Sequence, residues 1–258
     1  MLDLKKKVDI IKEDELRVGD CPSCAAIISQ CYYMVDKSTN KKSRWFSCRC
    51  GVVFNAQKPT KVYDEKYWLE HNKYDAKQKD SYEYPIRIYA PIAEELVYGR
   101  RVLIVGRPNT YQEEAFRERG WVTTVIDKNT CMNESDNLIA SDFETYQFPE
   151  NIKYNMIWFY DVIECFSNPI GALELCKNIM PEDGLVFVST PDTDLINTRS
   201  NSCFIHWKAD EHYVMWNKRS LSKHMDSIGF NTIMCRTNLE HRFNSWDNIH
   251  GLYQRCFF

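Results

Sequence analysis

The hydrophobic and polar positions of this sequence divide it into zones with different periods. Residues 21–54 hold two runs rich in β-branched and aromatic residues, separated by a polar turn at Lys37–Ser43. From position 101 onward, short apolar runs alternate with stretches in which apolar residues recur every three or four positions. The first pattern is typical of a β-hairpin, and the second is typical of strands that alternate with helices.

The second zone predicts an α/β fold. A buried strand at Val102–Val105 is followed by a helix that ends at Gly120 and by a second strand that ends at Asp127. Ser220 is the expected N-cap of the last helix. Such an alternation produces right-handed βαβ units and a mostly parallel sheet. Further strands are expected over 155–160, 185–191, 230–238 and 251–258, and further helices over 167–184 and 220–229.

The chain divides into three predicted regions. Residues 1–60 form a small module that starts with a short helical lead. Residues 61–100 are rich in tyrosine, lysine and acidic side chains and predict a helical connector, which Pro85 and Pro91 are expected to break. Residues 101–258 form the α/β domain.

Composition indicates an ordinary globular protein in a reducing compartment. The chain has 258 residues, 44% of them hydrophobic, which is enough for one full core and a small accessory module. No apolar run approaches the roughly 20 residues of a membrane span, and the N-terminus lacks the apolar segment of a secretory signal. Six of the 11 cysteines are scattered singly through apolar stretches, as reduced thiols would be. We therefore expect a cytoplasmic protein with no membrane partner.

Four other cysteines have the spacing of a metal site. Cys21 and Cys24 precede the predicted hairpin, and Cys48 and Cys50 follow it, so four thiolates meet at the ends of two knuckles. Such a set suits tetrahedral Zn²⁺ and leaves no open position for a substrate, which makes the predicted zinc structural. The second knuckle is one residue shorter than the usual C-x2-C, and Cys31 is the alternative ligand if its geometry fails.

Three residues of the α/β domain follow the pattern of a cofactor edge. Gly106 comes directly after the first strand, where backbone N–H groups and a helix N-terminus favour negative charge. Asp127 ends the second strand, the position from which a carboxylate accepts hydrogen bonds from ribose hydroxyls. Asp142 follows the third predicted strand and is placed to meet an adenine amino group. Each is weak evidence alone, but their order and spacing together indicate a cofactor site.

Two longer motifs lie in the same domain: "DVIECFSNP" at 161–169 and "STPDTDLINTRSNSCFIHWKADEHYVMWNKRSLSKHMDSIGF" at 189–230. With them, residues 101–237 resemble class I S-adenosylmethionine-dependent methyltransferases. The preceding "CPSC" and "CGVVFNAQKPT" resemble the zinc ribbon of methyltransferases found among sugar and surface-polysaccharide biosynthetic enzymes. The resemblance implies a Rossmann-like, mostly parallel seven-stranded sheet, with its last strand antiparallel, behind a small zinc ribbon.

The resemblance also implies where S-adenosylmethionine would bind. Gly106 corresponds to the loop beside the methionine part of the cofactor, Asp127 to the residue that binds the ribose and Asp142 to the residue that binds the adenine. The remaining cofactor-binding positions are the two later loop positions, Pro108 and Thr110, and the two residues past the fourth strand, Tyr160 and Asp161.

For catalysis, the resemblance makes His212 the first candidate for a general base, because a neutral imidazole can take a hydroxyl proton as the methyl group transfers. The alternative is a polar residue that organises a loop. Glu164 and Glu211 are second candidates and His206 is a third.

Three departures from the family pattern weaken the site. Ile104 replaces an acidic residue of the first strand, Pro108 and Thr110 replace loop glycines, and Cys165 replaces a histidine. A non-glycine residue in left-handed geometry costs about 1–2 kcal/mol, whereas micromolar binding is worth about 8 kcal/mol. A loop with a different backbone path would still bind the cofactor, although more weakly. The same sequence is equally compatible with an inactive relative that kept the fold.

The reaction can be narrowed by what the motifs lack. The stretch after the fourth strand reads "FYDVIE", without the Asn/Asp-Pro-Pro-Tyr motif of amino-methylating enzymes, and no Pro-Cys nucleophile of cytosine C5 enzymes occurs. Residues 1–90 hold 17 lysines and arginines against 13 acidic residues, an excess too small to indicate nucleic-acid binding by itself, although the sequence leaves such a partner open. We therefore expect O- or C-methylation of a small molecule, with a nucleotide sugar as the suggested acceptor.

Two rivals remain. A dehydrogenase would need G-x-G-x-x-G at the first turn, where this chain has "GRPNTY". The other rival is an inactive methyltransferase-like protein that binds or assembles with a protein partner through its zinc ribbon.

Overall fold

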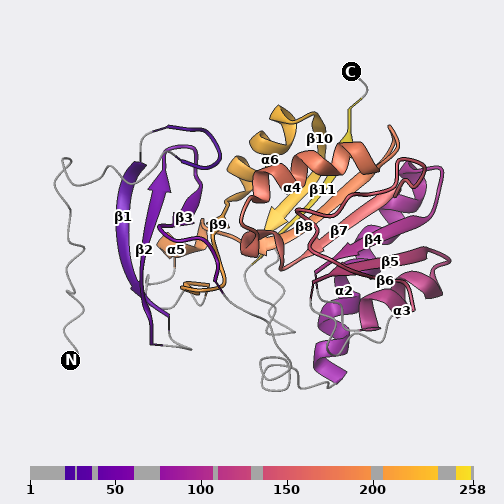
Figure 1. Ribbon diagram of the computed structural model, residues 1–258, viewed down its shortest axis with the longest axis horizontal. Coiled ribbons are helices and arrows are strands. Elements are labelled where there is room, and N and C mark those ends of the chain that lie inside the picture. Colours follow the sequence, from indigo (N-terminus) through magenta and orange to yellow (C-terminus); the bar gives the residue numbers. More distant parts are fainter. Residues whose placement is uncertain are drawn as a thin grey trace.

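The computed structural model describes residues 21–26, 28–36, 40–60, 76–106, 110–128, 136–198, 206–237 and 248–256. The predicted helical lead and Pro108 lie outside these ranges. The described chain forms a seven-stranded sheet with helices on both faces and, beside it, a four-stranded sheet (Figure 1). Among the described helices, none combines the length and the apolar character needed to cross a membrane.

The large sheet has the order β10-β11-β8-β7-β4-β5-β6. Strands β4 to β8 are parallel, and β11 runs antiparallel to both of its neighbours, β8 and β10. The predicted Rossmann-like sheet with an antiparallel last strand is confirmed. Its strands are β4 (Arg101–Val105), β5 (Val122–Asp127), β6 (Leu138–Ala140), β7 (Met156–Tyr160), β8 (Leu185–Pro191), β10 (Phe230–Thr237) and β11 (Asn248–Arg255).

Alternate side chains of the parallel strands serve two separate cores. In β4, Val102 and Ile104 pack in the core that contains residues of helices α2 (Ala76–Leu96) and α3 (Thr110–Glu118). Leu103 and Val105 pack in the core on the opposite face of the sheet. Both sets are buried because helices cover both faces, which is the usual condition of parallel strands. The helices are α2 (Ala76–Leu96) and α3 (Thr110–Glu118) on one face, and α4 (Pro169–Cys176) and α6 (Lys218–Ser227) on the other (Figure 1). Shorter helices are η2 (Ile163–Cys165), η3 (Lys177–Ile179) and α5 (Leu195–Thr198).

The small sheet is built from two distant parts of the chain. The predicted hairpin is present as β1 (Ile28–Val35) and β2 (Lys42–Cys48), and β3 (Val53–Asn55) pairs with β2. Its fourth strand, β9 (Val214–Met215), comes from the α/β region and pairs with β3. The cysteine-rich module therefore does not complete its own sheet.

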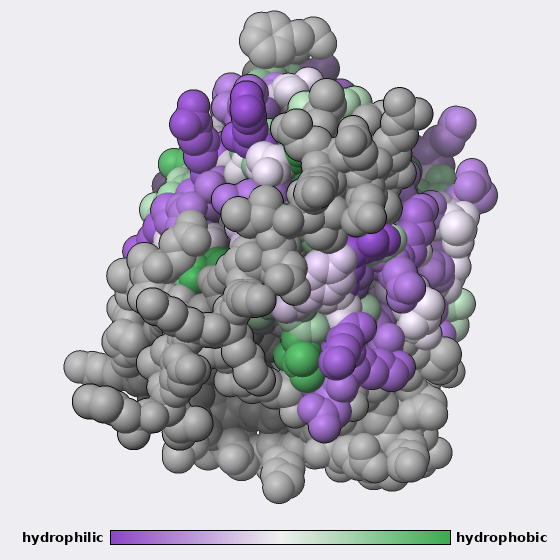
Figure 2. All heavy atoms as spheres, turned by 90° about the vertical axis from the view of Figure 1, so that its left-hand side faces the viewer, coloured by the Kyte–Doolittle hydropathy of each residue, from purple (hydrophilic) through white to green (hydrophobic). Residues whose placement is uncertain are grey.

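The side of the molecule that carries the small sheet is mainly hydrophilic over its described residues, with small and separate hydrophobic areas (Figure 2). Tyr33 and Val35 of β1 are its exposed large hydrophobic residues. Phe46 and Phe54 join the core that also holds α4 and α6. Trp45, Val53 and Met215 belong to a separate small core with Trp207. The two sheets thus share one hydrophobic core on that face.

Helix α2 corrects one prediction. It runs without a break through Pro85 and Pro91, although proline removes a helical hydrogen bond and usually kinks or ends a helix. Pro85 has no N–H for the carbonyl of Ser81, and that carbonyl instead accepts a hydrogen bond from the Tyr160 hydroxyl at 3.3 Å. A distant side chain therefore replaces the bond that the proline removes.

Helix α6 corrects another prediction, because its N-cap is Asn217 and not Ser220. The Asn217 side chain accepts from the Ser220 backbone N–H at 2.8 Å, and the Ser220 hydroxyl accepts from the Asn217 backbone N–H at 3.0 Å. The two residues form a reciprocal capping box, so the serine marks the third helical position.

Candidate functional site

The residues predicted to bind a cofactor lie at one edge of the large sheet. Register pairs Val105 with Ile126 on one side and with Phe159 on the other, so the next residues, Gly106, Asp127 and Tyr160, lie side by side. This is the carboxyl edge of the parallel strands. It is also the place where the chain, after running from β4 to β6 in one direction, resumes at β7 on the other side of β4. Open α/β sheets bind ligands at such a switch point.

Gly106 has the backbone conformation that the site needs from a glycine. Its φ is +85°, which L side chains rarely adopt, and its N–H donates to the Ile126 carbonyl at 3.0 Å. A Cβ at this position would lie 2.6 Å from Cγ2 of Val162, which follows β7. The turn after β4 therefore brings bare backbone against the turn after β7.

The two acidic residues differ in their surroundings. Asp127, the last residue of β5, is buried with 6% of its surface exposed. Asp142 is half-buried: its Oδ1 accepts from the Glu144 backbone N–H at 2.9 Å and its Oδ2 lies 3.4 Å from Lys128 Nζ. Thr110 is the first residue of α3, and the structure describes no residue between Gly106 and it.

Past β7, Asp161 anchors a buried polar network. Its backbone has a φ of +53°, a strained value for a non-glycine residue. Its Oδ1 accepts from the Ser189 hydroxyl at 2.7 Å and from the Asn248 side-chain amide. Burial raises the pKa of Asp161 to about 6, although these hydrogen bonds oppose the shift. Asn248 Oδ1 is buried and has no hydrogen-bond partner among the described residues.

Glu164 and His212, two of the candidates for catalysis, lie next to each other in the interior. The Glu164 Oε1 lies 3.9 Å from His212 Nε2, and its Oε2 accepts from the Thr190 hydroxyl at 3.0 Å. Burial, together with the Asp161 carboxylate, raises the pKa of Glu164 to about 8. Burial lowers the pKa of His212 well below its usual value. At neutral pH the pair therefore consists of a protonated carboxyl and a neutral imidazole.

The His212 ring is held by its other nitrogen. Its Nδ1 lies 3.0 Å from the carbonyl oxygen of His206, an oxygen that can only accept, so Nδ1 carries the hydrogen and Nε2 keeps its lone pair. Glu164, Cys165 and His212 place their ligand atoms within 4.8 Å of one another, a geometry that can hold a cation. Glu211, a weaker candidate, pairs with Lys208 Nζ at 3.0 Å instead.

The four predicted zinc ligands come together at the end of the small sheet. Cys21, Cys24, Cys48 and Cys50 place their sulfur atoms within 4.8 Å of one another, with 3.7 Å from Cys21 to Cys50 and 3.5 Å from Cys24 to Cys48. Four sulfurs about 2.3 Å from a zinc ion lie about 3.8 Å apart in a tetrahedron, so the cluster fits zinc. Cys31 lies outside this cluster.

The surroundings of Cys50 and the turn at Gly51 also agree with a zinc site. Contact with the Cys21 thiol and burial raise the pKa of the Cys50 thiol, so thiolates at this position need a cation for stability. Gly51 turns the chain with a φ of +97°, and its N–H donates to the Cys48 carbonyl at 3.0 Å.

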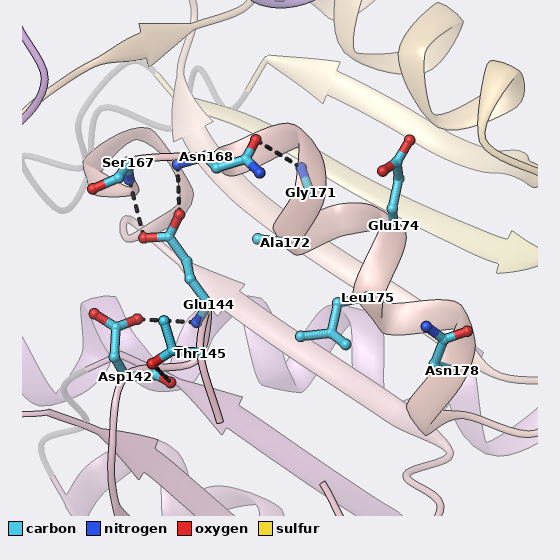
Figure 3. Close-up of a pocket in the computed structure, with 10 residues that line it drawn as sticks. All are labelled: Asp142, Glu144, Thr145, Ser167, Asn168, Gly171, Ala172, Glu174, Leu175 and Asn178. Carbon is cyan, nitrogen blue, oxygen red and sulfur yellow. Dashed lines mark hydrogen bonds between the residues drawn. The ribbon is translucent and has the colours of Figure 1, made fainter. Parts of the chain in front are cut away.

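A pocket of about 590 Å³ lies beside Asp142 (Figure 3). The two Glu144 carboxylate oxygens accept from the backbone N–H groups of Ser167 and Asn168, which ties the turn after β6 to the start of α4. Asp142 is the only predicted site residue among those that line the pocket. The others are Glu144, Thr145, Ser167, Asn168, Gly171, Ala172, Glu174, Leu175 and Asn178.

A family model described as "Methyltransferase domain" matches residues 32–234, which is more than half of the chain. The chain belongs to this family. The match begins in β1 and ends in β10, so it includes strands of both sheets. The large sheet is a class I S-adenosylmethionine-dependent methyltransferase fold, as the sequence motifs predicted.

Individual methyltransferases are similar over part or most of the chain. The ubiquinone biosynthesis O-methyltransferase of Glaesserella parasuis serovar 5 (strain SH0165) is 26% identical over 112 residues, which cover 36% of this chain and 46% of that enzyme. The chain therefore aligns with less than half the length of this curated relative.

Among solved structures, the magnesium protoporphyrin IX methyltransferase of Synechocystis PCC 6803, with bound S-adenosylhomocysteine, has a TM-score of 0.55 at 11% identity, covering 75% of this chain and 96% of its own. A chain from the complex between the Haloferax volcanii Trm112 methyltransferase activator and a methyltransferase also has a TM-score of 0.55, at 13% identity, covering 76% of this chain and 100% of its own. At these identities the similarity establishes the methyltransferase fold.

The sequence did not indicate several polar residues that hydrogen-bond to the candidate site residues Asp161 and Glu164. Ser189 and Thr190 lie within the "STP" motif, which was singled out only as part of a resemblance. Asn248 has no local signal, because its partner Asp161 is far away along the chain. These residues become visible only when the strands are paired.

Proposed function

We propose that this protein transfers a methyl group from S-adenosylmethionine to a hydroxyl or carbon of a small molecule. The observation that carries the proposal is the row of Asp127, Gly106 and Tyr160 across three adjacent strands at the switch point of a methyltransferase-family sheet. In this arrangement a carboxylate, bare backbone and an aromatic side chain share one edge.

We assign the cofactor to this edge. Asp127 is the ribose partner, and Asp142, farther along the edge past β6, is the adenine partner. Gly106 lines the methionine side, where a larger residue would meet Val162. Tyr160 and Asp161 line the methyl-donor side. Thr110, the first residue of α3, and Pro108, which lies outside the described residues, are the other proposed cofactor-binding positions.

His212 is the proposed general base. S-adenosylmethionine, when bound, supplies an electrophilic methyl group. As the acceptor oxygen takes that methyl, its hydroxyl proton moves to His212 Nε2, whose lone pair is available because Nδ1 donates to the His206 carbonyl. Glu164, protonated at neutral pH, leaves the adjacent imidazole neutral before the transfer.

The acceptor class follows from the relatives and the motifs together. The curated relative is named as an O-methyltransferase of ubiquinone biosynthesis, and the Synechocystis enzyme as a methyltransferase of magnesium protoporphyrin IX. Both names point to small-molecule acceptors. A nucleotide sugar is our specific suggestion, from the resemblance of the cysteine module to polysaccharide-cluster enzymes.

We propose that Cys21, Cys24, Cys48 and Cys50 hold one structural Zn²⁺. We also propose a reducing, cytoplasmic setting, because six other cysteines are scattered singly through apolar stretches of the sequence. The second candidate function, an inactive methyltransferase-like module that binds a partner through its zinc ribbon, is favoured by the departures in the loop after Gly106. The Haloferax complex with a methyltransferase activator is a precedent for a protein partner on this fold.

Thermal denaturation with S-adenosylmethionine separates the two functions. Ligand at 100 times its Kd should stabilise the folded protein by about 2.7 kcal/mol. A concentration-dependent rise in Tm is expected. If millimolar S-adenosylmethionine leaves the Tm unchanged, the enzyme proposal fails and the binding module is the better account.

A further inference from the structure

The small sheet makes its most deeply buried polar contact with the segment that carries His212. Asn55, at the end of β3, is 2% exposed. Its side-chain amide donates to the carbonyl oxygens of Ala209 at 2.8 Å and His212 at 3.3 Å, and its backbone N–H donates to the Tyr213 carbonyl at 2.8 Å. One residue of the cysteine-rich module therefore holds three carbonyls of a loop more than 150 positions away.

Further contacts of this segment, residues 206–216, come from the cysteine-rich module, and others come from the large-sheet region, where the Tyr213 backbone N–H donates to the Glu164 carbonyl at 2.7 Å. Asp210 pairs with Lys41 and accepts from the backbone N–H of Thr60 at 3.0 Å. The Trp207 ring lies edge-on to Trp45 of β2, with ring centroids 5.2 Å apart. Within 206–216, the only regular element that the structure describes is the two-residue strand β9. The backbone of the segment is therefore held mainly by these contacts and not by hydrogen bonds of a helix or a longer strand.

The position of the His212 ring depends on that loop. Its Nδ1 is bonded to the carbonyl of His206 in the same segment, and its main chain is bonded to Asn55. A shift of the 206–216 backbone would therefore move Nε2 relative to the Glu164 carboxyl group, whose Oε2 is held by the Thr190 hydroxyl of β8, while the Tyr213 backbone N–H ties the same segment to the Glu164 carbonyl at 2.7 Å.

The cysteine knuckle is joined to the same region. Asn55 lies in the strand that directly follows the second knuckle, and the Cys48 backbone N–H donates to the Val52 carbonyl at 2.9 Å. The Gly51 carbonyl accepts from the Thr193 hydroxyl at 3.3 Å, and a Cβ on Gly51 would lie 2.8 Å from the Asn217 side chain. The knuckle thus packs against residues on both sides of the 206–216 segment.

We propose that the zinc ribbon is a working part of the acceptor side of the site, in which Asn55 is a positioning residue for His212. Metal at the four cysteines fixes β3, β3 fixes the 206–216 segment, and that segment fixes the imidazole. This inference rests on the proposed function only for the role of His212; the coupling between Asn55 and the imidazole is a separate structural claim.

Histidine NMR tests the coupling directly in the full-length, zinc-loaded protein. The chain has six histidines, so selective labelling gives few imidazole signals, and a His212→Gln variant assigns the one of interest. In Asn55→Ala we expect the His212 signal to shift or broaden while the signals of His224 and His250, which lie outside the 206–216 segment, stay in place.

The matched control is Ser29→Ala, which removes a 2.8 Å hydrogen bond from the Ser29 hydroxyl to the Ser47 carbonyl on the exposed side of the same sheet. It should leave the His212 signal unchanged. An Asn55→Ala protein that folds and keeps its His212 signal in place would overturn the proposal.

A second measurement needs no variant. Hydrogen–deuterium exchange of the wild-type chain is compared before and after zinc is removed by a chelator under reducing conditions. Exchange in 206–216 should become on the order of tenfold faster, because loss of its bonds to β3 raises the opening equilibrium. Unchanged exchange there, with faster exchange in 42–55, would refute the coupling. Neither measurement uses S-adenosylmethionine, so failure of the proposed methyl transfer is detected separately by the thermal denaturation test.

Discussion

The large sheet takes its seven strands from residues 101–255, whereas the small sheet takes three strands from 28–55 and its fourth from 214–215. In the large sheet, the candidate cofactor edge arises where parallel strands end, and each residue is placed by its own strand. In the small sheet, the candidate metal site is local, but the structure around it depends on contacts with a distant loop.

Because of this difference, substitutions at the candidate cofactor edge and at the candidate metal site should affect different properties of the protein. The cofactor edge depends on a few residues in a sheet that is buried on both faces, so single substitutions there should change binding more than folding. The ribbon has little core of its own and depends on its metal, so loss of a ligand should change folding first.

The largest effect is expected from Cys48→Ala, because it removes one of four metal ligands. We predict loss of bound zinc and a drop of several kcal/mol in stability, given that structural zinc binding is worth about 10–16 kcal/mol in finger peptides. Metal analysis and thermal denaturation measure both. Cys31→Ala is the control: this buried cysteine lies outside the cluster and should keep one equivalent of zinc. Equal zinc loss in both variants would contradict the assignment.

Asp127→Asn should weaken the cofactor edge without unfolding it. Hydrogen bonds to a charged group contribute about 1.5–3 kcal/mol, so we expect the Kd for S-adenosylhomocysteine to rise about 10- to 100-fold. Isothermal titration calorimetry gives this value. Asp226→Asn, at an exposed position of α6, should bind as the wild type does. Wild-type affinity in Asp127→Asn would remove this carboxylate from the site.

Gly106→Ala and Gly120→Ala separate backbone strain from steric contact. Both glycines have a positive φ, +85° and +81°, so each alanine should cost about 1–2 kcal/mol of stability. Only at Gly106 does the new Cβ meet a close neighbour, Val162 Cγ2 at 2.6 Å; at Gly120 the nearest atom is 3.7 Å away. Chemical denaturation should show the larger loss for Gly106→Ala, with partial rescue by Val162→Ala. Equal losses, with no rescue, would contradict this close approach.

The smallest predicted effect is a pH dependence from Glu164. Its pKa is raised to about 8 in the folded protein, so the folded state keeps a proton that the unfolded state releases near the usual pKa of 4.5. The resulting stability is present below that value and is lost as pH rises toward 8, by about 1 kcal/mol between pH 7 and 8. Glu164→Gln should flatten this part of the stability profile, measured by urea denaturation. Glu118→Gln, an exposed carboxyl, should keep the wild-type slope, and a wild-type slope in Glu164→Gln would exclude the shift.

The sequence predicted those features whose signals are local. Ligand spacing identified the four cysteines, and the order of strands placed Gly106, Asp127 and Asp142 at one edge. The sequence could not predict that α2 continues through Pro85, because the hydroxyl that satisfies the freed carbonyl belongs to Tyr160 in another strand.

The role of Asn55 was missed for the same physical reason. Its amide contacts Ala209 and His212, and no periodicity or motif connects positions so far apart. The contribution of β9 to the small sheet is likewise a long-range pairing. The parts of the site that depend on such contacts therefore required the fold.

The central claim is that S-adenosylmethionine binds across the carboxyl edge of β4 and β5. A crystal structure of the zinc-loaded protein with S-adenosylhomocysteine tests it most directly. We predict the ribose at Asp127, the adenine beside Asp142 and the amino-acid end against Gly106. An edge that stays empty at millimolar ligand, or a ligand bound in the pocket along α4 and away from Asp127, would contradict the account.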